Sequence, residues 1–252
     1  LQLDLVTHHA AQIDVRISVT DPRYDAEVNL LGLLNLLEGA REVKTARFVF
    51  VSSGGVVYGE PVTFPTPETA PKFPLSPYGV TKLSGELYLN YYRQIHGLEY
   101  VALRYGNVYG PRQDPHGEAG VVAIFSSRLL AGDPLTIFGD GEQTRDYTYV
   151  KDIVSANMVA SDLSLAEAGD LDGVAFNVGT GRGVSVNLLA DTLESVVGVR
   201  PGRNHETARP GELQHSCLDT DRLQAHGWAC QRSLEEGLRE TYEHIARGRG
   251  AA

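Results

Sequence analysis

The sequence contains little sulfur, with two cysteines and one methionine among its 252 residues, and it has a single tryptophan. Cys217 and Cys230 are not part of a Cys-x-x-Cys pair, so the sequence favours neither a zinc site nor a disulfide framework, and we expect a reduced, cytoplasmic setting. No apolar run reaches the roughly 18 residues of a membrane-spanning helix. The opening LQLDLVTHHAA lacks the basic residues and the long apolar core of a signal peptide.

Basic residues are also scarce, since 22 Lys and Arg stand against 32 Asp and Glu and give a net charge of −10. General binding to nucleic acid or to an anionic membrane needs a basic face, so the composition argues against both kinds of partner. An anionic ligand must therefore be met by a few placed arginines. The histidines show no metal-ligand spacing, and we expect no metal; His205, His215 and His226 are interpreted as surface or packing residues.

A length of 252 residues is long for one domain and short for two. The content of 42% hydrophobic and 21% charged residues is typical of a soluble globular protein that can bury its own core. The sequence does not begin with methionine, and its first residues have the pattern of an interior strand. We therefore expect a chain that begins partway through a fold.

Strand and helix patterns alternate in the first half of the sequence. Continuous apolar runs predict buried strands at residues 3–10, 47–53 and 99–105. Helical spacing predicts helices at 22–43 and 76–95, the second with Ser76 as its N-cap and Pro77 in its first turn. This alternation predicts an α/β fold, a Rossmann-like doubly wound parallel sheet with helices on both faces.

The second half is less regular and predicts a smaller, mixed α/β lobe. Helices are expected at 120–130, 151–163, 185–197 and 233–247, and strands at 135–138 and 174–179. The last helix opens with a capping box, Ser233-x-x-Glu236. We expect residues 1–110 to form the sheet domain and 111–252 mainly the C-terminal lobe, with segments at about 140–180 returning to the sheet.

The candidate chemistry centres on Tyr78 and Lys82, which are four residues apart on a predicted helix and therefore share one face. Tyr78 lies in the first turn, where the helix dipole favours a phenolate, and Lys82 adds a positive charge. A tyrosine with an ordinary pKa of about 10 needs such help to act as a base near neutral pH. The pair by itself is equally compatible with a surface tyrosine and lysine.

Two flanking segments strengthen the prediction of a site. VSSGGVVYGE (51–60) follows the buried strand at 47–53, and LRYGNVYGPRQDP (103–115) follows the next strand. In an open parallel sheet, ligands bind where the carboxyl ends of the strands meet. We therefore expect these segments and the Tyr78–Lys82 face to converge on one crevice.

Seven motifs occur in order along the chain: HHAAQ (8–12), VSSGGVVYGE (51–60), SPYGVTK (76–82), LRYGNVYGPRQ (103–113), TRDYTYVKD (144–152), FNVGTG (176–181) and RPGE (209–212). This set resembles the extended short-chain dehydrogenase/reductases, and most closely the NAD-dependent nucleotide-sugar epimerases of the UDP-glucose 4-epimerase type. The resemblance implies 4-epimerisation of a UDP-glucose/UDP-galactose type of substrate through a 4-keto intermediate. It assigns NAD to the sheet domain, the nucleotide sugar mainly to the C-terminal lobe, and a homodimer to the helices at 22–43 and 76–95.

The resemblance also implies a role for individual residues. Tyr78 matches the base that takes the proton from the sugar 4-hydroxyl, and Lys82 matches the lysine that lowers the pKa of this base and holds the nicotinamide ribose. Ser53 is the candidate for the hydroxyl that bonds the 4-oxygen. Further residues match positions that contact NAD: His9, Ala10, Ala11, Gln12, Asn29, Val51, Ser52, Tyr105 and Val108. Others, together with Ser53, match positions that hold the nucleotide sugar: Gly54, Asn107, Val121, Arg145, Arg209 and Glu212. His116 is expected near the substrate loop.

Two features depart from the family pattern. Many such epimerases have a third serine where this sequence has Gly54, so the catalytic hydroxyl must come from Ser53 or from Ser52. The Gly-x-x-Gly-x-x-Gly turn that receives the pyrophosphate is also absent from the sequence, and we expect roughly the first sixty residues of such a fold to be missing. If the expressed chain starts at Leu1, we expect little NAD binding.

Other functions remain open at this point. A 4,6-dehydratase of the same family would carry Asp-Glu after the strand-end residue, where this sequence has Gly54 and Gly55. A reductase or a decarboxylase is excluded less easily. The alternative of another class is a non-catalytic fragment that binds a nucleotide sugar through Arg145 and Arg209.

Overall fold

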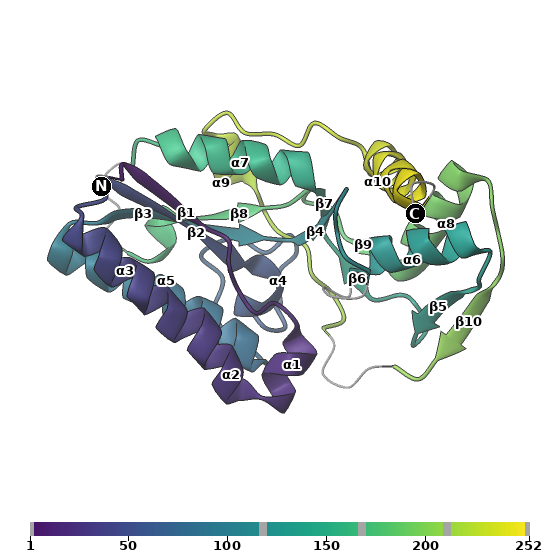
Figure 1. Ribbon diagram of the computed structural model, residues 1–252, viewed down its shortest axis with the longest axis horizontal. Helices are drawn as coiled ribbons and strands as arrows, with labels where there is room; N and C mark the ends of the chain where they lie inside the picture. Colours follow the sequence, from purple (N-terminus) through teal and green to yellow (C-terminus); the bar gives the residue numbers. More distant parts are fainter. Residues whose placement is uncertain (1–2, 116–119, 166–169, 209–212, 250–252) are drawn as a thin grey trace.

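The computed structural model describes residues 3–115, 120–165, 170–208 and 213–249, which form two lobes side by side (Figure 1). One lobe is built on a parallel sheet with helices on both faces. The other gathers α6 (Val121–Ala131), α8 (Val186–Val197) and α10 (Leu234–Arg249) against the two-stranded pair of β5 (Leu135–Phe138) and β10 (Arg203–Glu206). In the described part of the chain, no helix combines the length and the apolar character that crossing a membrane requires.

The main sheet has four parallel strands in the order β1 (Leu5–His8), β2 (Arg47–Ser53), β3 (Glu99–Tyr105) and β8 (Ala175–Val178). The two strands predicted at 47–53 and 99–105 are confirmed residue for residue. In register, Ser53 lies opposite Tyr105, which in turn lies opposite Val178, so the carboxyl ends of three strands are level. The predicted fold class, a Rossmann-like parallel α/β sheet, is confirmed.

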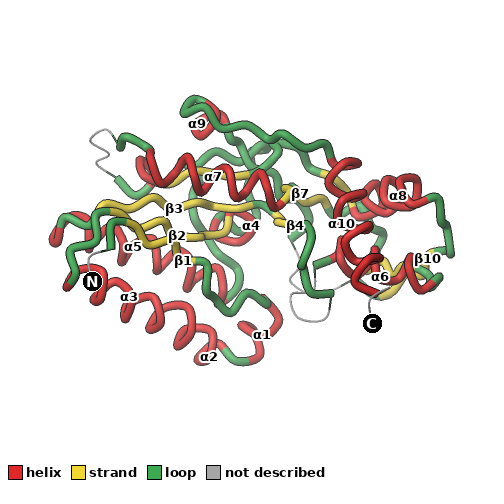
Figure 2. Tube along the Cα trace, turned by 45° about the horizontal axis from the view of Figure 1, so that its top comes forward, coloured by secondary structure: helices red, strands yellow, loops and turns green. Residues whose placement is uncertain are grey.

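Both faces of the sheet are apolar because helices cover both (Figure 2). Phe48 and Phe50 of β2 pack toward α3 (Gly32–Glu42) and α5 (Pro77–His96). Val49 points to the opposite face, where α7 (Val150–Asp162) packs. This explains the continuous apolar run in β2, since alternate residues of a strand face opposite sides.

Strand β1 differs from the expected buried strand. It pairs only with β2 among the described strands, and its residues alternate between exposed and half-buried. Leu5 is 40% exposed. An edge strand has one hydrogen-bonded neighbour, so an apolar sequence there need not be buried on both faces.

Helix α5 has the ends that its sequence predicts. The Ser76 hydroxyl accepts a hydrogen bond from the Gly79 amide at 3.2 Å, and Gly97 closes the helix at a φ of 71°. A left-handed residue at this position is a common helix ending that glycine adopts without strain. The cap fixes Tyr78 in the first turn and Lys82 one turn later.

The predicted helix at 22–43 is interrupted. It consists of α2 (Pro22–Ala26), a π-helical stretch η1 (Glu27–Leu31) and α3, and the unpredicted α1 (Val15–Thr20) precedes it. Within this run, Asn29 donates from Nδ2 to the Asp25 carboxylate at 3.0 Å. π-helical turns often occur at functional sites, and this one turns Asn29 toward the segment that follows β1.

Several short elements were not predicted from the sequence. These are α4 (Gly54–Val57), β4 (Asn107–Tyr109), β6 (Thr144–Arg145), β7 (Tyr147–Tyr149), η2 (Asp172–Val174), β9 (Val184–Ser185) and α9 (Asp221–Gln224). The pairs β4–β7 and β6–β9 lie where the chain passes between the lobes, while α7 and β8 pack in the sheet lobe. The capping box of α10 is confirmed: Ser233 and Glu236 each bond the other's amide, at 3.2 and 3.0 Å.

Candidate active site

The candidate site lies at the carboxyl edge of the sheet, where β2 ends and α5 begins. The Ser53 hydroxyl hydrogen-bonds the Tyr78 phenol. The Lys82 ammonium lies 5.7 Å from the centre of the Tyr78 ring and 5.2 Å from the centre of the Phe50 ring, and donates to the Val51 carbonyl at 2.8 Å. The structure therefore brings together the hydroxyl, the phenol and the ammonium that the sequence singled out.

The two neighbouring serines have different surroundings. Ser52 is buried, and its hydroxyl donates to the Glu86 carboxylate at 2.5 Å. Ser53 is half-buried and faces Tyr78. Successive residues of a strand point to opposite sides, so only one of the two hydroxyls can face the phenol. The side chain of Ser52 is engaged inside the protein.

Burial opposes ionisation of both Tyr78 and Lys82. It raises the pKa of Tyr78, and the negative charge of Asp25 raises it further, whereas the hydrogen bond from Ser53 lowers it. The sequence had suggested that the helix N-terminus and Lys82 would favour the phenolate. In the structure, the loss of solvent outweighs them. Burial likewise lowers the pKa of Lys82 to about 8, while the charges of Asp25 and Glu86 raise it.

The segment after β1 is fastened to η1. The Gln12 amide donates to Asn29 Oδ1 at 2.8 Å, and Asn29 Nδ2 donates to the Gln12 carbonyl at 2.8 Å. This pair of hydrogen bonds presents the preceding residues along the sheet edge, with His9 and Ala10 exposed and Ala11 half-buried. Burial and the charge of Lys82 lower the pKa of His9.

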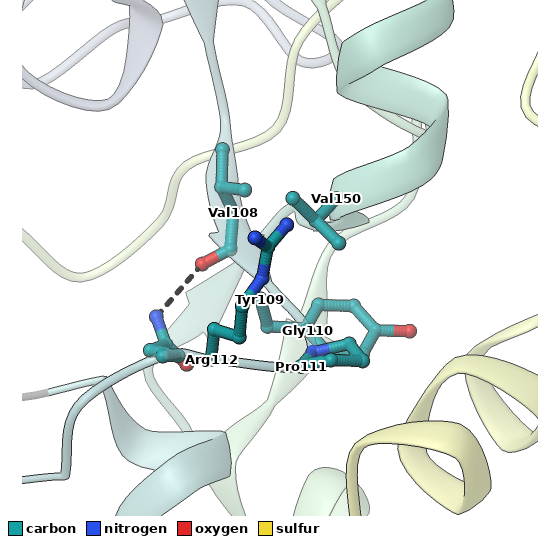
Figure 3. Close-up of a pocket in the computed structure, with 7 residues that line it drawn as sticks. Val108, Tyr109, Gly110, Pro111, Arg112 and Val150 are labelled. Atoms are coloured by element: carbon teal, nitrogen blue, oxygen red, sulfur yellow. Dashed lines mark hydrogen bonds between the residues drawn. The ribbon is translucent and has the colours of Figure 1, made fainter. Parts of the chain in front are cut away.

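Tyr105 and Val108 continue the site beyond β3. The Tyr105 hydroxyl accepts a hydrogen bond from Asn157 of α7 at 2.6 Å, and burial raises the pKa of Tyr105. Val108 lines a cavity of about 260 Å³, in which its carbonyl accepts from Gln113 Nε2 at 3.1 Å (Figure 3). Arg112 adopts a φ of 73° and extends its side chain toward Val150.

The two glycines after Ser53 have opposite surroundings. A Cβ added to Gly54 would lie 2.6 and 2.7 Å from the methyl carbons of Leu218, so a third serine does not fit here without repacking. A Cβ on Gly55 would instead lie 3.9 Å from Asn107 Oδ1, 3.9 Å from Ser53 Oγ and 4.0 Å from Ser216 Oγ. Polar oxygens of three side chains, Ser53, Asn107 and Ser216, thus lie around Gly55.

The remaining predicted substrate residues are more dispersed. Half-buried Arg145 lies on β6 and donates to the Thr144 carbonyl at 2.8 Å, next to the strand bridge between Thr144 and His215. Val121 starts α6 and packs on the core of the second lobe. Arg209, Glu212 and His116 lie outside the described residues.

The other histidines have local contacts. His205 lies near the Gly139 carbonyl, His215 near the Thr144 hydroxyl, and His226 packs edge-on against Phe176. Among the residues that the structure describes, there is no group of three or more His, Cys, Asp or Glu that could hold a metal ion.

Three residues of this region were missed by the sequence analysis: Asp25, Glu86 and Ser216. Glu86 follows Lys82 by four residues, so helical spacing could have placed it on the same helix face as Tyr78 and Lys82. Asp25 precedes Asn29 by the same spacing. Ser216 has no local signal, since it reaches Gly55 only through the fold.

Comparison with known proteins identifies the family. The NAD dependent epimerase/dehydratase family matches residues 1–179 of this chain. The chain belongs to this family. It is 46% identical over 241 residues to the UDP-glucose 4-epimerase of Mycolicibacterium smegmatis, an alignment that covers 95% of this chain and 75% of that protein.

Solved structures of family members agree with this assignment. The UDP-glucose 4-epimerase of Thermotoga maritima, solved with UDP-glucose, has a TM-score of 0.91 and 47% identity, and the match covers 98% of this chain and 78% of that one. The UDP-glucose 4-epimerase of Thermus thermophilus, solved with NAD, has a TM-score of 0.90 and 44% identity, with 99% and 79% covered. The family resemblance read from the seven motifs is confirmed.

Proposed function

We propose that this chain catalyses the NAD-dependent 4-epimerisation of a nucleotide-diphosphate sugar of the UDP-glucose/UDP-galactose type. One observation carries the proposal: Ser53, Tyr78 and Lys82 meet at the carboxyl edge of a parallel sheet. Membership of the epimerase/dehydratase family supports it, as do the relatives solved with UDP-glucose and with NAD.

The residues of this edge suit the nicotinamide end of NAD. Lys82 is 4% exposed and carries three N–H groups, of which the bond to Val51 uses one. A buried ammonium with donors to spare fits ribose hydroxyls. We place Tyr105, Val108, Asn29 and the segment at residues 9–12 beside the same group. When bound, NAD supplies the hydride chemistry at the sugar C4.

The work of this chain is proton transfer and positioning. Tyr78 takes the proton of the sugar 4-hydroxyl and returns it at the end. Because the hydride taken from C4 is returned as well, no net redox change occurs. Ser53 holds the 4-oxygen and hydrogen-bonds the same phenol. The ammonium of Lys82 favours the phenolate of Tyr78, which burial disfavours. Between the two halves of the reaction, the 4-keto sugar presents its other face.

The nucleotide sugar is assigned to the space between the lobes. Asn107 and Gly54 border the sugar end, and Arg145 on β6 is placed to meet the diphosphate, with Arg209, Glu212 and Val121 as further candidates. A guanidinium pairs with phosphate oxygens in a forked geometry, which suits an otherwise acidic protein. In this division, the sheet lobe holds NAD and the second lobe holds the substrate.

The surroundings of Gly54 disfavour a 4,6-dehydratase. Such an enzyme needs a carboxylate pair after the strand-end residue, but a side chain at Gly54 would collide with Leu218. A proton NMR assay separates the reactions. With UDP-glucose and NAD, we expect UDP-galactose to accumulate to equilibrium without net NADH. A 4-keto-6-deoxy product, net NADH formation, or no conversion of UDP-, dTDP- or GDP-sugars would contradict the proposal.

We further propose that the protein is a cytoplasmic homodimer. An exposed apolar stripe runs along α5 at helical spacing, with Val80, Leu87, Tyr88, Tyr91 and Ile95 between 39% and 64% exposed. A patch of this kind marks a protein interface. Light scattering should give twice the monomer mass, and Leu87→Glu should give the monomer mass. Free Cys217 and Cys230 suit a reducing compartment, which cell fractionation tests.

A further inference from the structure

Asp25 is a carboxylate buried beside the candidate site, with no solvent exposure. Its Oδ1 accepts hydrogen bonds from Gln12 Nε2 at 2.9 Å and from Asn29 Nδ2 at 3.0 Å. Its Oδ2 accepts from the Thr81 hydroxyl at 2.8 Å. All three donors are neutral, so they satisfy the oxygens of Asp25 without cancelling its charge. A buried charge is costly unless an opposite charge compensates it.

The negative charge of Asp25 acts on Lys82, which follows its hydrogen-bond partner Thr81 on α5. The other carboxylate near Lys82 is Glu86, whose charge is already compensated: Arg104 donates from Nη2 to Glu86 Oε2 at 2.6 Å and from Nε to Oε1 at 3.0 Å. Asp25 has no such arginine among the described residues. Its charge is therefore left to act on Lys82.

The other ionisable groups around this pair do not replace Asp25. Burial lowers the pKa of His8 to about 4 and also lowers the pKa of His9, so both are neutral at neutral pH. Glu27 of η1 is exposed to solvent. Charged groups of α1 and α3, which pack against α5, have partners of their own: Arg16 pairs with Asp14, and Arg41 pairs with Glu38, which also accepts a hydrogen bond from Tyr92 of α5.

We propose that Asp25 is a positioning residue whose carboxylate keeps Lys82 in its ammonium form beside Tyr78. The same carboxylate ties Gln12 and Asn29, on the cofactor-facing segment, to Thr81 of the helix that carries Tyr78 and Lys82. The buried carboxylate of Asp25 thus influences both the position of the Tyr78–Lys82 pair and the charge state of its members. The catalytic consequence rests on the proposed function; the pairing of Asp25 with Lys82 does not.

The charge of Asp25 acts in the same direction on both members of the pair. It raises the pKa of Lys82 and raises the pKa of Tyr78. Asp25→Asn keeps the shape of the side chain and removes the charge, so both values should fall. If activity requires the phenolate of Tyr78 and the ammonium of Lys82, both limbs of the pH profile of kcat/KM should move to lower pH.

A titration without substrate or cofactor tests the pairing directly. The chain has four lysines, so the ¹³Cε signal of Lys82 can be followed by NMR and assigned with Lys82→Met. In the unmodified protein, we expect a midpoint of about 8. In Asp25→Asn it should fall by about one pH unit, since a nearby opposite charge shifts a pKa by roughly 1–3 units. Glu27→Gln, the same chemical change on an exposed neighbour, should leave the midpoint in place.

An unchanged Lys82 midpoint in folded Asp25→Asn would overturn the inference. If that variant does not fold, Asp25→Ser removes the same charge from a smaller side chain and must give the same downward shift. The pH profile of kcat/KM adds a second readout. If Asp25 had only a structural role, Asp25→Asn would lower kcat/KM at every pH and leave both limbs of the profile in place. A shifted midpoint in a protein that epimerises no nucleotide sugar would refute the proposed function and leave the pairing intact.

Discussion

Helix α5 carries two buried charged groups one turn apart, Lys82 and Glu86, and they differ in how many hydrogen-bond partners surround them. Glu86 accepts hydrogen bonds from Ser52 and Arg104, and Arg104 also bonds Asp172 at 2.9 Å and the Tyr58 hydroxyl at 3.1 Å. Among the described residues, Lys82 donates to one acceptor, the Val51 carbonyl, and its ammonium lies 5.7 Å from the centre of the Tyr78 ring. A saturated ionic cluster stabilises one geometry, whereas a buried ammonium with spare donors is suited to bind.

Helix α5 thus contributes both to the stability of the fold and to the candidate site. The Glu86–Arg104 cluster fixes α5 against β3 and reaches η2 through Asp172. Because that cluster stabilises the position of α5, the helix can also carry Tyr78 and Lys82 at a site where burial disfavours the charged form of both side chains. Variants of the Tyr78–Lys82 pair should therefore lose activity, whereas variants of the Glu86–Arg104 cluster should lose stability.

The largest effect is expected at Tyr78. Tyr78→Phe removes the base, and turnover should fall by roughly 10²–10⁴-fold, the usual contribution of general acid–base catalysis. Affinity for the nucleotide sugar, measured by calorimetry, should change little. Tyr242→Phe in α10 is a matched control. If Tyr78→Phe keeps its turnover, Tyr78 is not the base.

The next effect is expected at Arg104 and concerns stability. Arg104→Met leaves Glu86 as an uncompensated buried charge, which should lower the free energy of unfolding by about 3–5 kcal/mol. Lys151→Met, which removes an exposed ion pair to Glu240, should cost about 0–1 kcal/mol. Urea unfolding of both variants measures the contrast. Equal losses in the two variants would show that the buried ionic cluster contributes no more to stability than the exposed ion pair does.

A smaller effect is expected at acid pH from His8. Burial lowers its pKa to about 4 from an ordinary value of 6.5. Between these values the unfolded chain binds more protons than the folded one, so stability should fall as the pH drops from 6.5 toward 4. Urea midpoints at pH 7 and pH 5 should differ less in His8→Gln than in the unmodified protein. Exposed His205→Gln should leave the difference unchanged.

Strands β2 and β3 and helix α5 were predictable because their signals are local. Apolar runs set both strands, and Ser76 with Pro77 set the start of α5. The break of the predicted helix at 22–43 was not predictable, since it depends on contacts between Asn29 and Gln12 that lie outside the helix. The short pairs β4–β7 and β6–β9 join segments whose few residues carry no pattern of their own.

The part of the candidate site that lies within sequence motifs was predictable. The sequence singled out Ser53, Tyr78 and Lys82, which the structure brings together, while their catalytic roles stay predictions. Asp25 meets Thr81, a residue far along the chain, so its part could not be read from spacing. The contact between Gly54 and Leu218, which leaves no room for a side chain at Gly54, likewise depends on the fold and could not be predicted from the sequence.

At the end of β2, we propose that the sheet edge at Ser53 is reactive and that the interior at Ser52 is structural. Turnover of Ser53→Ala and Ser52→Ala, measured side by side with UDP-glucose and NAD, tests it most directly. We expect a large loss of turnover in Ser53→Ala with stability kept, and near-normal turnover in Ser52→Ala with reduced stability. A larger loss of turnover in a folded Ser52→Ala would contradict it.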